Sequence, residues 1–596
     1  MAVLRKYEWI LAIISVAFCA SSFGNGANDV ANSYATSVAA RSLTMPQVGF
    51  LSMITEFVGA VALGARVTKT VKSGIIDITK FTPSPGVMML AMGCAEIGSA
   101  TWLIVATKFG FPVSTTQTVV GALVGVGIAS QANVKWAWAD GSVSQIAASW
   151  GIAPAIAAAF SAMIFATVKY SVLERRDPLK WAMRLIPLYL SFTAAVLALF
   201  ILVELPGGQS YEEFGIGRMC GIILGVFFGA LAFSYIFFLP YFHRRLIRED
   251  SRIKFYHVPL GPLLWRDDPW LYFPGPANGN FVIDYYKSSH VSSTQAPPTS
   301  PPNDQLNPDA IKPSLDGKAK NVDSPSPSSI EKGGAEHTTT ATLASKQFLE
   351  PEERFLAPTK HLPFYNPSRV WSYVKFFFLQ GVSRDCVSHD SESLAKTHAK
   401  AKRYDNRVEH LWTYAQVASA MMMSIAHGSN DVANAVGPWV GAYDTFITGV
   451  VDKEANTPIW ILVVAGFLLG AGFWFFGYNI IRALGNKITQ LSPTRGFSME
   501  LGAAITVLLA SRLGLPVSTT QCLTGATIGT ALMNYDLGAV NWKQLMWIST
   551  RSEYAYIEKE SSHLLLTLYK PWLPGAERCI PTTLHDLSLE EFVAQT

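Results

Sequence analysis

Charged side chains are scarce in this sequence. Asp, Glu, Lys and Arg make up 15% of the 596 residues, whereas 50% are hydrophobic and the mean hydropathy is +0.25. Such an apolar composition excludes an ordinary soluble protein and indicates a chain that crosses the membrane several times. The net charge of +4 says little by itself, and we expect no nucleic acid among the partners.

Cysteine is also scarce, and its spacing excludes two kinds of site. The chain has six cysteines with no CxxC pair, and four of them lie in apolar runs. We therefore expect neither a disulfide framework nor a metal centre. The sequence also lacks a nucleophile–base constellation and a nucleotide-binding loop, so we predict that the protein is not an enzyme and carries no cofactor.

Long apolar runs predict an all-α polytopic membrane protein with about 10–12 membrane segments. The first run, Trp9–Cys19, follows Arg5 and Lys6 as a signal sequence would. No convincing cleavage site comes after it, so we expect it to remain in the mature chain. The positive-inside rule places the basic loop at 174–184 and the chain after 243 in the cytoplasm, and the acidic loop 204–213 outside.

The middle of the chain changes character. Residues 288–345 are rich in Ser, Pro, Thr, Lys and Asp, which predicts disorder. The charge runs at 243–248 and 396–407 are interpreted as topology signals rather than lipid sites. We expect five parts: a first transport repeat at 1–172, two linking membrane helices at 173–242, a cytoplasmic loop at 243–410, a second repeat at 411–550 and an atypical tail at 551–596.

Three landmarks occur twice in the same order. Asn28 recurs as Asn430, an offset of 402, while Glu96 recurs as Glu500 and Pro112 as Pro516, both an offset of 404. The segment Pro-Val-Ser-Thr-Thr-Gln is identical in both copies. Repeated halves with discontinuous helices are typical of secondary transporters, which bind their substrate between the repeats. We expect the two repeats to be inverted.

The sequence Asn-Asp-Val-Ala-Asn interrupts an apolar run at 28–32 and again at 430–434. An Asp at the centre of a membrane helix costs about 2.5–3.5 kcal/mol on insertion scales, so its repetition indicates a function. We expect the preceding glycines to let each helix break at membrane depth, and the oxygens to bind a small cation such as Na⁺. The candidate sodium ligands are Asn28, Asp29, Asn32, Asn430, Asp431 and Asn434.

The repeated Pro-Val-Ser-Thr-Thr-Gln segment predicts a helix start, with proline followed by hydroxyl residues at the cap and first turn. Free N–H groups and the helix dipole make such a start an anion site. Two facing starts could surround a tetrahedral oxyanion. Neither segment contains Arg or Lys, so dipoles and bound cations would offset the charge, which agrees with co-transport. The candidate hydroxyl ligands are Ser114, Thr115, Thr116, Ser518, Thr519 and Thr520.

Together the four motifs resemble those of the inorganic phosphate transporter family, which includes fungal phosphate-repressible, sodium-dependent permeases. The resemblance covers about residues 1–250 and 400–548. It implies symport of phosphate with Na⁺, an inverted repeat and a large cytoplasmic middle loop. It implies that the hydroxyl ligands bind phosphate with Gln117 and Gln521, that Asp29 and Asp431 border it, and that Glu56, Glu96 and Glu500 are coupling carboxylates.

Two residues break the repeat. Glu56 has no glutamate at the matching place in the second half, so we expect its role to be asymmetric. His427 stands where the first half has Asn25, and we interpret it as a packing or hydrogen-bonding residue rather than a proton relay.

The end of the chain departs from the family. In the first half Trp136 is followed by an apolar span at 144–172, whereas Trp542 is followed by residues such as Arg551, Glu553, Glu558 and Lys559. We expect 551–596 to lie outside the bilayer and to leave the apolar run 517–533 without its covering helix, which would weaken transport.

The sequence thus predicts a multi-pass plasma-membrane symporter that imports phosphate with Na⁺ by alternating access, with a homodimer as a candidate assembly. Two alternatives stay open. One is a transporter that uses H⁺ or carries another oxyanion, and the other is a membrane sensor or receptor that binds phosphate without transporting it.

Overall fold

The computed structural model describes residues 4–139, 141–204, 215–266, 273–274, 282–286, 349–387, 391–452, 457–485 and 487–552. Within these ranges the chain is helical, and its β-structure is a single bridge between Ile76 and Val134. The segment 288–345, the acidic loop from residue 205 and the tail from residue 553 lie outside the described residues, so the predictions for them stay predictions. The helices are α1 (Glu8–Ala39), α2 (Met45–Leu63), α3 (Ala65–Ser73), α4 (Pro85–Lys108), α5 (Thr115–Ala129), α6 (Val143–Val168), α7 (Pro178–Glu204), α9 (Ile216–Phe233), α10 (Leu239–Phe242), α11 (Pro367–Leu379), α12 (Glu392–Ala399), α13 (Asn406–Thr448), α14 (Ile459–Leu484), α15 (Pro493–Arg512), α16 (Thr519–Leu532) and α17 (Trp542–Ser552).

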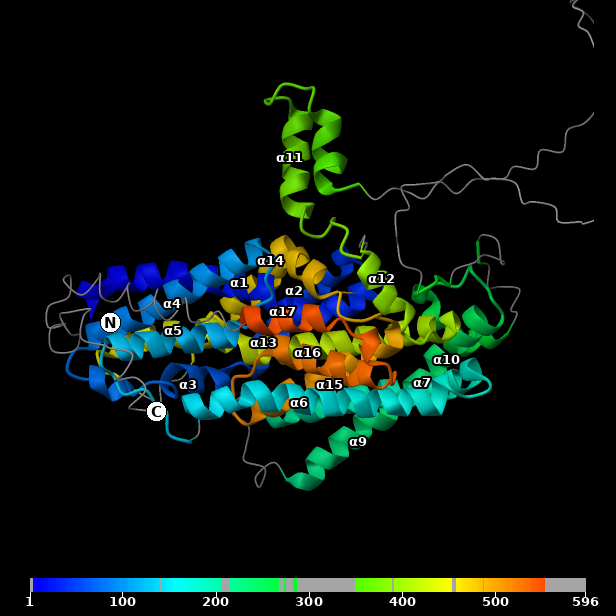
Figure 1. Ribbon diagram of the computed structural model, residues 1–596, viewed down its shortest axis with the longest axis horizontal. Coiled ribbons are helices and arrows are strands. Elements are labelled where there is room, and N and C mark those ends of the chain that lie inside the picture. Colours follow the sequence, from blue (N-terminus) through cyan, green and yellow to red (C-terminus); the bar gives the residue numbers. More distant parts are fainter. Residues whose placement is uncertain are drawn as a thin grey trace, which may run out of the picture.

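Most of these helices run along the long axis of the molecule (Figure 1). Seven of the described helices, α1, α2, α4, α6, α7, α9 and α14, are long and apolar enough to cross a bilayer, some of them extended by an adjoining turn. Four more, α5, α13, α15 and α16, pack among the seven, and the expected number of 10–12 membrane segments stays a prediction. The protein is therefore an all-α, multi-pass membrane protein.

In each half, the helix that carries the Asn-Asp motif packs against a helix of the other half. Helix α1 of the first half packs along α14 of the second, and α13 of the second half packs along α2 of the first. Each contact depends on a glycine of the Asn-Asp motif. A Cβ atom on Gly26 would lie 1.9 Å from the carbonyl oxygen of Leu469, and one on Gly428 would lie 2.7 Å from that of Glu56. These glycines therefore serve close approach between helices.

The expected breaks at the Asn-Asp motifs are wrong. Helix α1 continues for 32 residues and α13 for 43 residues without interruption through the motifs. From Gly24 to Ala39 in α1 and from Met422 to Ala442 in α13, every residue is buried. The motifs therefore lie on two continuous helices at the centre of the protein. Their glycines allow neighbouring helices to approach closely and do not interrupt the helix.

The discontinuities lie instead at the hydroxyl segments. Helix α4 ends at Lys108 and α5 begins at Thr115, and between them Gly110 adopts a positive φ of 68°. Gly514 repeats this conformation, with φ of 69°, between α15 and α16. Helices α5 and α16 have 15 and 14 residues. At 1.5 Å per residue they reach only about 22 Å, short of the roughly 30 Å hydrocarbon core. Both begin inside the protein, since Thr115 and Thr519 are buried.

Helix α6, the last helix of the first half, covers the second half. It packs against α16 and α15, where a Cβ atom on Gly525 would lie 2.2 Å from the carbonyl oxygen of Pro154 and one on Gly529 would lie 2.1 Å from that of Ala158. The Ser161 hydroxyl also donates to the carbonyl of Ala526, at 2.7 Å. The expectation that the run 517–533 lacks a covering helix is therefore wrong, because that helix comes from the other half.

Candidate functional site

Two connecting segments, 109–114 between α4 and α5 and 513–518 between α15 and α16, meet at the centre of the molecule. The Thr116 hydroxyl donates to the carbonyl of Val517 at 3.0 Å, and the Thr520 hydroxyl donates to the carbonyl of Val113 at 3.4 Å. Each segment is also a helix start, as predicted. Ser114 caps α5 by accepting from the Gln117 N–H, and Ser518 caps α16 by accepting from the Gln521 N–H. The N-termini of α5 and α16 thus come together, as a facing pair of anion sites requires.

Asn28 fastens the first connecting segment to α1. Its amide nitrogen donates to the Thr107 hydroxyl at 3.1 Å and to the carbonyl of Phe111 at 3.0 Å, while its amide oxygen accepts from the Val113 N–H at 3.1 Å. All donors and the oxygen of this side chain are thus engaged with the segment that precedes α5.

Asn430 repeats this arrangement in the second half. Its amide nitrogen donates to Ser511 and to the carbonyl of Leu515, both at 3.2 Å, and its oxygen accepts from the Val517 N–H at 3.3 Å. The repeat seen in the sequence is therefore a repeat of hydrogen bonds.

Asp29 lies at the N-terminus of α5. Its Oδ2 accepts from the Thr115 hydroxyl at 2.7 Å and from the Thr115 N–H at 3.2 Å, and its Oδ1 accepts from the Thr520 hydroxyl at 3.2 Å. Because the side chain is only 1% exposed, these donors replace water around the carboxylate. A carboxylate of the protein thus holds the donors that the sequence assigned to an incoming anion.

Asp431 is bound less completely. Its Oδ2 accepts from the Thr519 hydroxyl at 3.0 Å, while its Oδ1 has no hydrogen-bond partner among the described residues. His427, one helical turn earlier on α13, places its Nε2 3.1 Å from Asp431 Oδ2, an ion-pair distance that lacks good hydrogen-bond alignment.

Asn32 and Asn434 connect each half to the hydroxyls of the other. Asn32 donates to the Thr520 hydroxyl at 2.8 Å, and Asn434 donates to the Thr116 and Thr115 hydroxyls at 3.1 and 3.0 Å. The amide oxygens of both asparagines are buried without a partner in the described part of the chain. The side-chain oxygens of Gln117 and Gln521 are orphaned in the same way.

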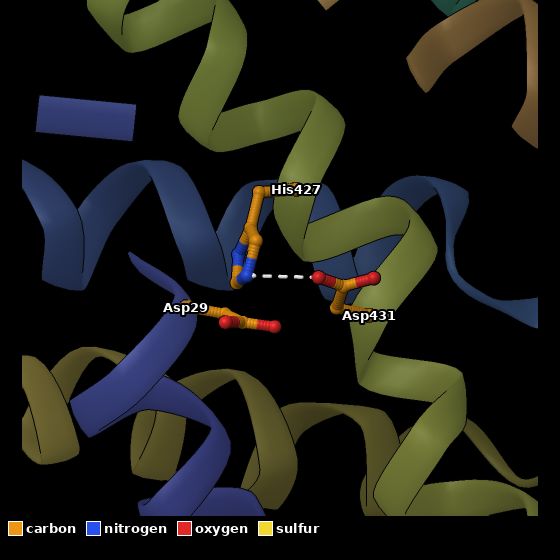
Figure 2. Close-up of side chains that lie close together, drawn as sticks. All are labelled: Asp29, His427 and Asp431. Carbon is orange, nitrogen blue, oxygen red and sulfur yellow. Dashed lines mark ion pairs between the residues drawn. The ribbon is translucent and has the colours of Figure 1, made fainter. Parts of the chain in front are cut away.

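These free oxygens fit a hard cation. Oxygen ligands are preferred by small hard cations, and a buried oxygen without a donor is costly unless something binds it. Figure 2 shows Asp29 of α1 facing His427 and Asp431 of α13. One ligand atom from each of the three lies within 4.8 Å of the others. The two continuous helices therefore bring the repeated aspartates to one place.

His427 and Glu56 form a second buried link. His427 Nδ1 lies 2.7 Å from Glu56 Oε2, and the Ser424 hydroxyl donates to Glu56 Oε1 at 2.5 Å. The two residues that break the sequence repeat are therefore bonded to each other. The sequence interpretation gave His427 a packing or hydrogen-bonding role, and it missed that the imidazole bridges Glu56 and Asp431. The sequence signal that could have linked them is that neither residue has a counterpart in the other half.

Glu96 and Glu500 occupy matching positions in the repeat but differ in surroundings. Glu500 accepts from Thr36, Ser37 and Ser419, each at 2.6 Å, and from Gln416 at 3.2 Å. Both oxygens of Glu96 are buried without a hydrogen bond of good geometry in the described part of the chain, and the Ser21 hydroxyl of α1 lies beside the carboxylate. The structure thus connects Glu500 to α1 and α13 and does not connect Glu96 to the site by a described hydrogen bond.

Comparison with known proteins identifies the family of this chain. Residues 25–551 match the model of the phosphate transporter family. The phosphate-repressible phosphate permease of Neurospora crassa is 38% identical over 568 residues, covering 92% of this chain and 94% of the permease. Sodium-dependent phosphate transporter 1-A of Xenopus laevis is 26% identical, covering 91% and 92%.

The fold also has a solved relative. A structure described as the sodium-dependent phosphate transporter superposes with a TM-score of 0.62 at 22% identity, covering 95% of this chain and all of the other. The match over most of the chain, and the permease at 38% identity, establish that this protein is a member of the phosphate transporter family.

Proposed function

We propose that the protein imports inorganic phosphate by symport with Na⁺, using alternating access at a site between the two repeats. One observation carries the proposal: the facing N-termini of α5 and α16 present their hydroxyl donors to two buried aspartates. Helix N-termini bind phosphate because free N–H groups and the dipole favour negative charge. Relatives described as sodium-dependent phosphate transporters support both the substrate and the ion.

The charges around the site require a cation. Asp29 and Asp431 are fully buried there, and His427 is the basic residue that lies beside them. A phosphate anion placed against these carboxylates would be repelled, and repulsion is strong where water is excluded. Na⁺ held by carboxylate and amide oxygens would neutralise the aspartates before the anion arrives.

The hydrogen bonds suggest an order of binding. In the structure Thr115 gives both its N–H and its hydroxyl to Asp29. When Na⁺ draws Asp29 Oδ2 away from α5, these donors become available to a phosphate oxygen. Na⁺ therefore binds first, and a corresponding step at Asp431 releases the Thr519 hydroxyl. Thr116 and Thr520, which bridge the connecting segments, complete the phosphate ligands with Ser114, Ser518, Gln117 and Gln521.

We propose distinct roles for the asparagines. Asn32 and Asn434, whose amide oxygens are unpartnered, ligate Na⁺ together with Asp29 and Asp431. Asn28 and Asn430 act on Na⁺ through the connecting segments that they hold. Glu56 acts on the site through His427. Glu500 acts through its hydrogen bonds to α1 and α13. Both carboxylates would thus couple ion binding to the positions of these helices. Glu96 is retained as a coupling carboxylate on the repeat alone.

Uptake of labelled phosphate into proteoliposomes tests the proposal. We expect uptake to require an inward Na⁺ gradient, to persist when a pH gradient is collapsed, and to resist competition by sulfate. Uptake driven by a pH gradient without Na⁺, or blocked by sulfate, would replace this reading with another ion or oxyanion. Phosphate binding without any uptake would indicate the sensor, which the transporter relatives do not favour.

We place the protein in the plasma membrane, because a permease that imports phosphate acts there and the fungal relative is a permease. We also keep the inverted relation of the repeats and the five-part division of the chain as proposals. The reciprocal packing of α1 on α14 and of α13 on α2 supports two equivalent halves.

We further propose a homodimer through α9. This helix has no buried residue, and Gly217, Gly221, Gly225 and Gly229 repeat every fourth position with open space where a Cβ atom would be. Small residues at this spacing let membrane helices approach closely. Exposed Cys220 lies on the same helix, so oxidative cross-linking in membranes should give a dimer that Cys220→Ser abolishes. Absence of a cross-link, with Cys220 still reactive to a maleimide, would refute the interface.

A further inference from the structure

A basic cleft of about 670 Å³ opens where α7 begins. Helix α10 lies at the same end of the molecule (Figure 1). Four separate segments form it: the start of α7, the stretch from Tyr235 to Ile247, the turn that ends at Trp265 and the N-cap of α13. Its charged residues are Arg176, Lys180, Arg184, Arg407, Asp177 and Asp405. Four cations against two carboxylates leave the cleft positive.

The protein does not neutralise this surplus itself. Asp405 is paired with Arg407 at 3.2 Å. Arg176 and Lys180 have no ion pair in the described part of the chain, and Arg184 lies over the Trp181 ring at 5.6 Å. The first turn of α7, a helix of 27 residues, opens into the same cleft and adds the positive end of its dipole.

Two acidic groups near the cleft, Glu174 and Asp250, are engaged elsewhere. Glu174 binds Lys402 at 2.7 Å, and this hydrogen bond holds the pKa of Glu174 below its usual range. Asp250 accepts from Arg252 at 2.8 Å and from Arg244 at 3.3 Å, and the Arg252 bond likewise lowers the pKa of Asp250. Both carboxylates therefore stay charged and paired at neutral pH. With Arg407 paired to Asp405, the cations Arg176, Lys180 and Arg184 face one carboxylate in the cleft, Asp177, and leave a positive surplus for an external anion.

One side of the cleft is apolar, and exposed apolar side chains continue from it along α7. Tyr235 and Ile247 line the cleft and are 46% and 47% exposed. On α7, Leu188 and Phe192 follow Arg184 at one and two turns, and each is 44% exposed. A single helix face thus leads from cations to apolar side chains, which is the chemistry of an amphiphile with an anionic head.

We propose that this cleft binds the headgroup of an anionic phospholipid, with an acyl chain lying along Leu188 and Phe192. Basic pockets between membrane helices on the cytoplasmic side are suited to such headgroups. The lipid would connect α7 to the start of α13, the helix that carries Asp431. Its binding does not depend on which substrate is transported.

Native mass spectrometry of the purified full-length protein tests the site. The probes are phosphatidylserine and phosphatidylcholine with identical acyl chains, and soluble inositol hexakisphosphate. We expect the wild type to retain phosphatidylserine in preference to phosphatidylcholine. The triple variant Arg176→Gln/Lys180→Gln/Arg184→Gln should bind phosphatidylserine about a hundredfold more weakly. The matched control, Arg354→Gln/Lys360→Gln/Lys375→Gln, removes three exposed cations elsewhere and should bind as the wild type does.

A second variant separates lipid from free phosphate compounds. Leu188→Ala/Phe192→Ala keeps every cation, so it should weaken phosphatidylserine binding and leave any binding of inositol hexakisphosphate unchanged. Equal phosphatidylserine retention by the wild type and the triple variant would overturn the site. Inositol hexakisphosphate binding as tightly as the lipid, with no effect of the alanine substitutions, would overturn the lipid as its occupant.

Discussion

Neutralising Asp29 should separate phosphate binding from its dependence on Na⁺. In the structure the carboxylate accepts from the Thr115 N–H and hydroxyl, at 3.2 and 2.7 Å, which are the donors assigned to phosphate. The substitution Asp29→Asn keeps the shape of the side chain and removes its charge. Asp431→Asn makes the corresponding change on α13.

The expected magnitude follows from these two hydrogen bonds. A hydrogen bond to a charged group is worth about 1.5–3 kcal/mol and one to a neutral group about 0.5–1.5 kcal/mol. Losing the charge therefore weakens the hold of residue 29 on Thr115 by about 1 kcal/mol per bond, or about 2 kcal/mol for both. Phosphate binding in the absence of Na⁺ should then tighten by about thirtyfold, and Na⁺-driven uptake should be lost.

Equilibrium binding of labelled phosphate to purified protein measures the first effect, with Na⁺ replaced by choline, and proteoliposome uptake measures the second. Asp444→Asn is the control, because Asp444 lies on α13, beyond Asp431 and outside the site. If Asp29→Asn and Asp431→Asn both retained the wild-type Na⁺ dependence of phosphate binding, competition between aspartate and phosphate would be the wrong mechanism.

Three further results are expected. Thr115→Val and Thr519→Val each remove one hydroxyl donor, so the apparent affinity for phosphate in uptake should fall about ten- to a hundredfold. Thr→Ser at either position keeps the hydroxyl and should preserve the affinity. Unchanged affinity in the valine variants would mean that these hydroxyls only cap helices. Glu500→Gln should lower the free energy of unfolding by about 1–3 kcal/mol, because an amide NH₂ would face hydroxyl donors. Glu96→Gln should change it much less, since the Glu96 carboxylate has only Ser21 beside it and no hydrogen bond of good geometry to lose. Thermal unfolding in detergent measures both. Arg252 holds the pKa of Asp250 below its usual range, so the stabilisation from Asp250 is present above about pH 3.9 and is lost as pH falls through the lowered value. Protease resistance of residues 250–266 should therefore persist to pH 4 in the wild type. Asp250→Asn should reduce it at pH 4 and above, and the two proteins should converge once the pH lies below the lowered value.

The repeat in the sequence predicts more of the site than of the packing. The identical hydroxyl segments predicted helix starts, and Ser114 and Ser518 cap α5 and α16 as expected. The spacing of the two Asn-Asp motifs could not reveal that α1 and α13 remain continuous. Glycine permits both a backbone break and a close helix contact, and only the neighbouring Leu469 and Glu56 carbonyls decide between them.

His427 shows a different limit. A single histidine in an apolar run is usually a packing residue, and nothing in its own surroundings in the sequence indicates Glu56, which lies 371 residues away. The repeat offered an indirect signal, because both residues lack a counterpart. Likewise, the sequence places α6 next to α5 along the chain, whereas packing places it on α16 and α15. Contacts between halves depend on shape that a repeat offset does not encode.

The exchange of α6 has a consequence for biosynthesis. Ser161 and its partner Ala526 are separated by 365 residues, so at 5–20 residues per second the ribosome needs roughly 20–70 s to make the second after the first. During this interval the face of α6 that later contacts Gly525 and Gly529 must be shielded by lipid, the translocon or a membrane chaperone. A chain that stops before α16 lacks part of its second half and leaves α6 of the first half uncovered. Quality control can therefore recognise truncated copies by the exposed face of α6.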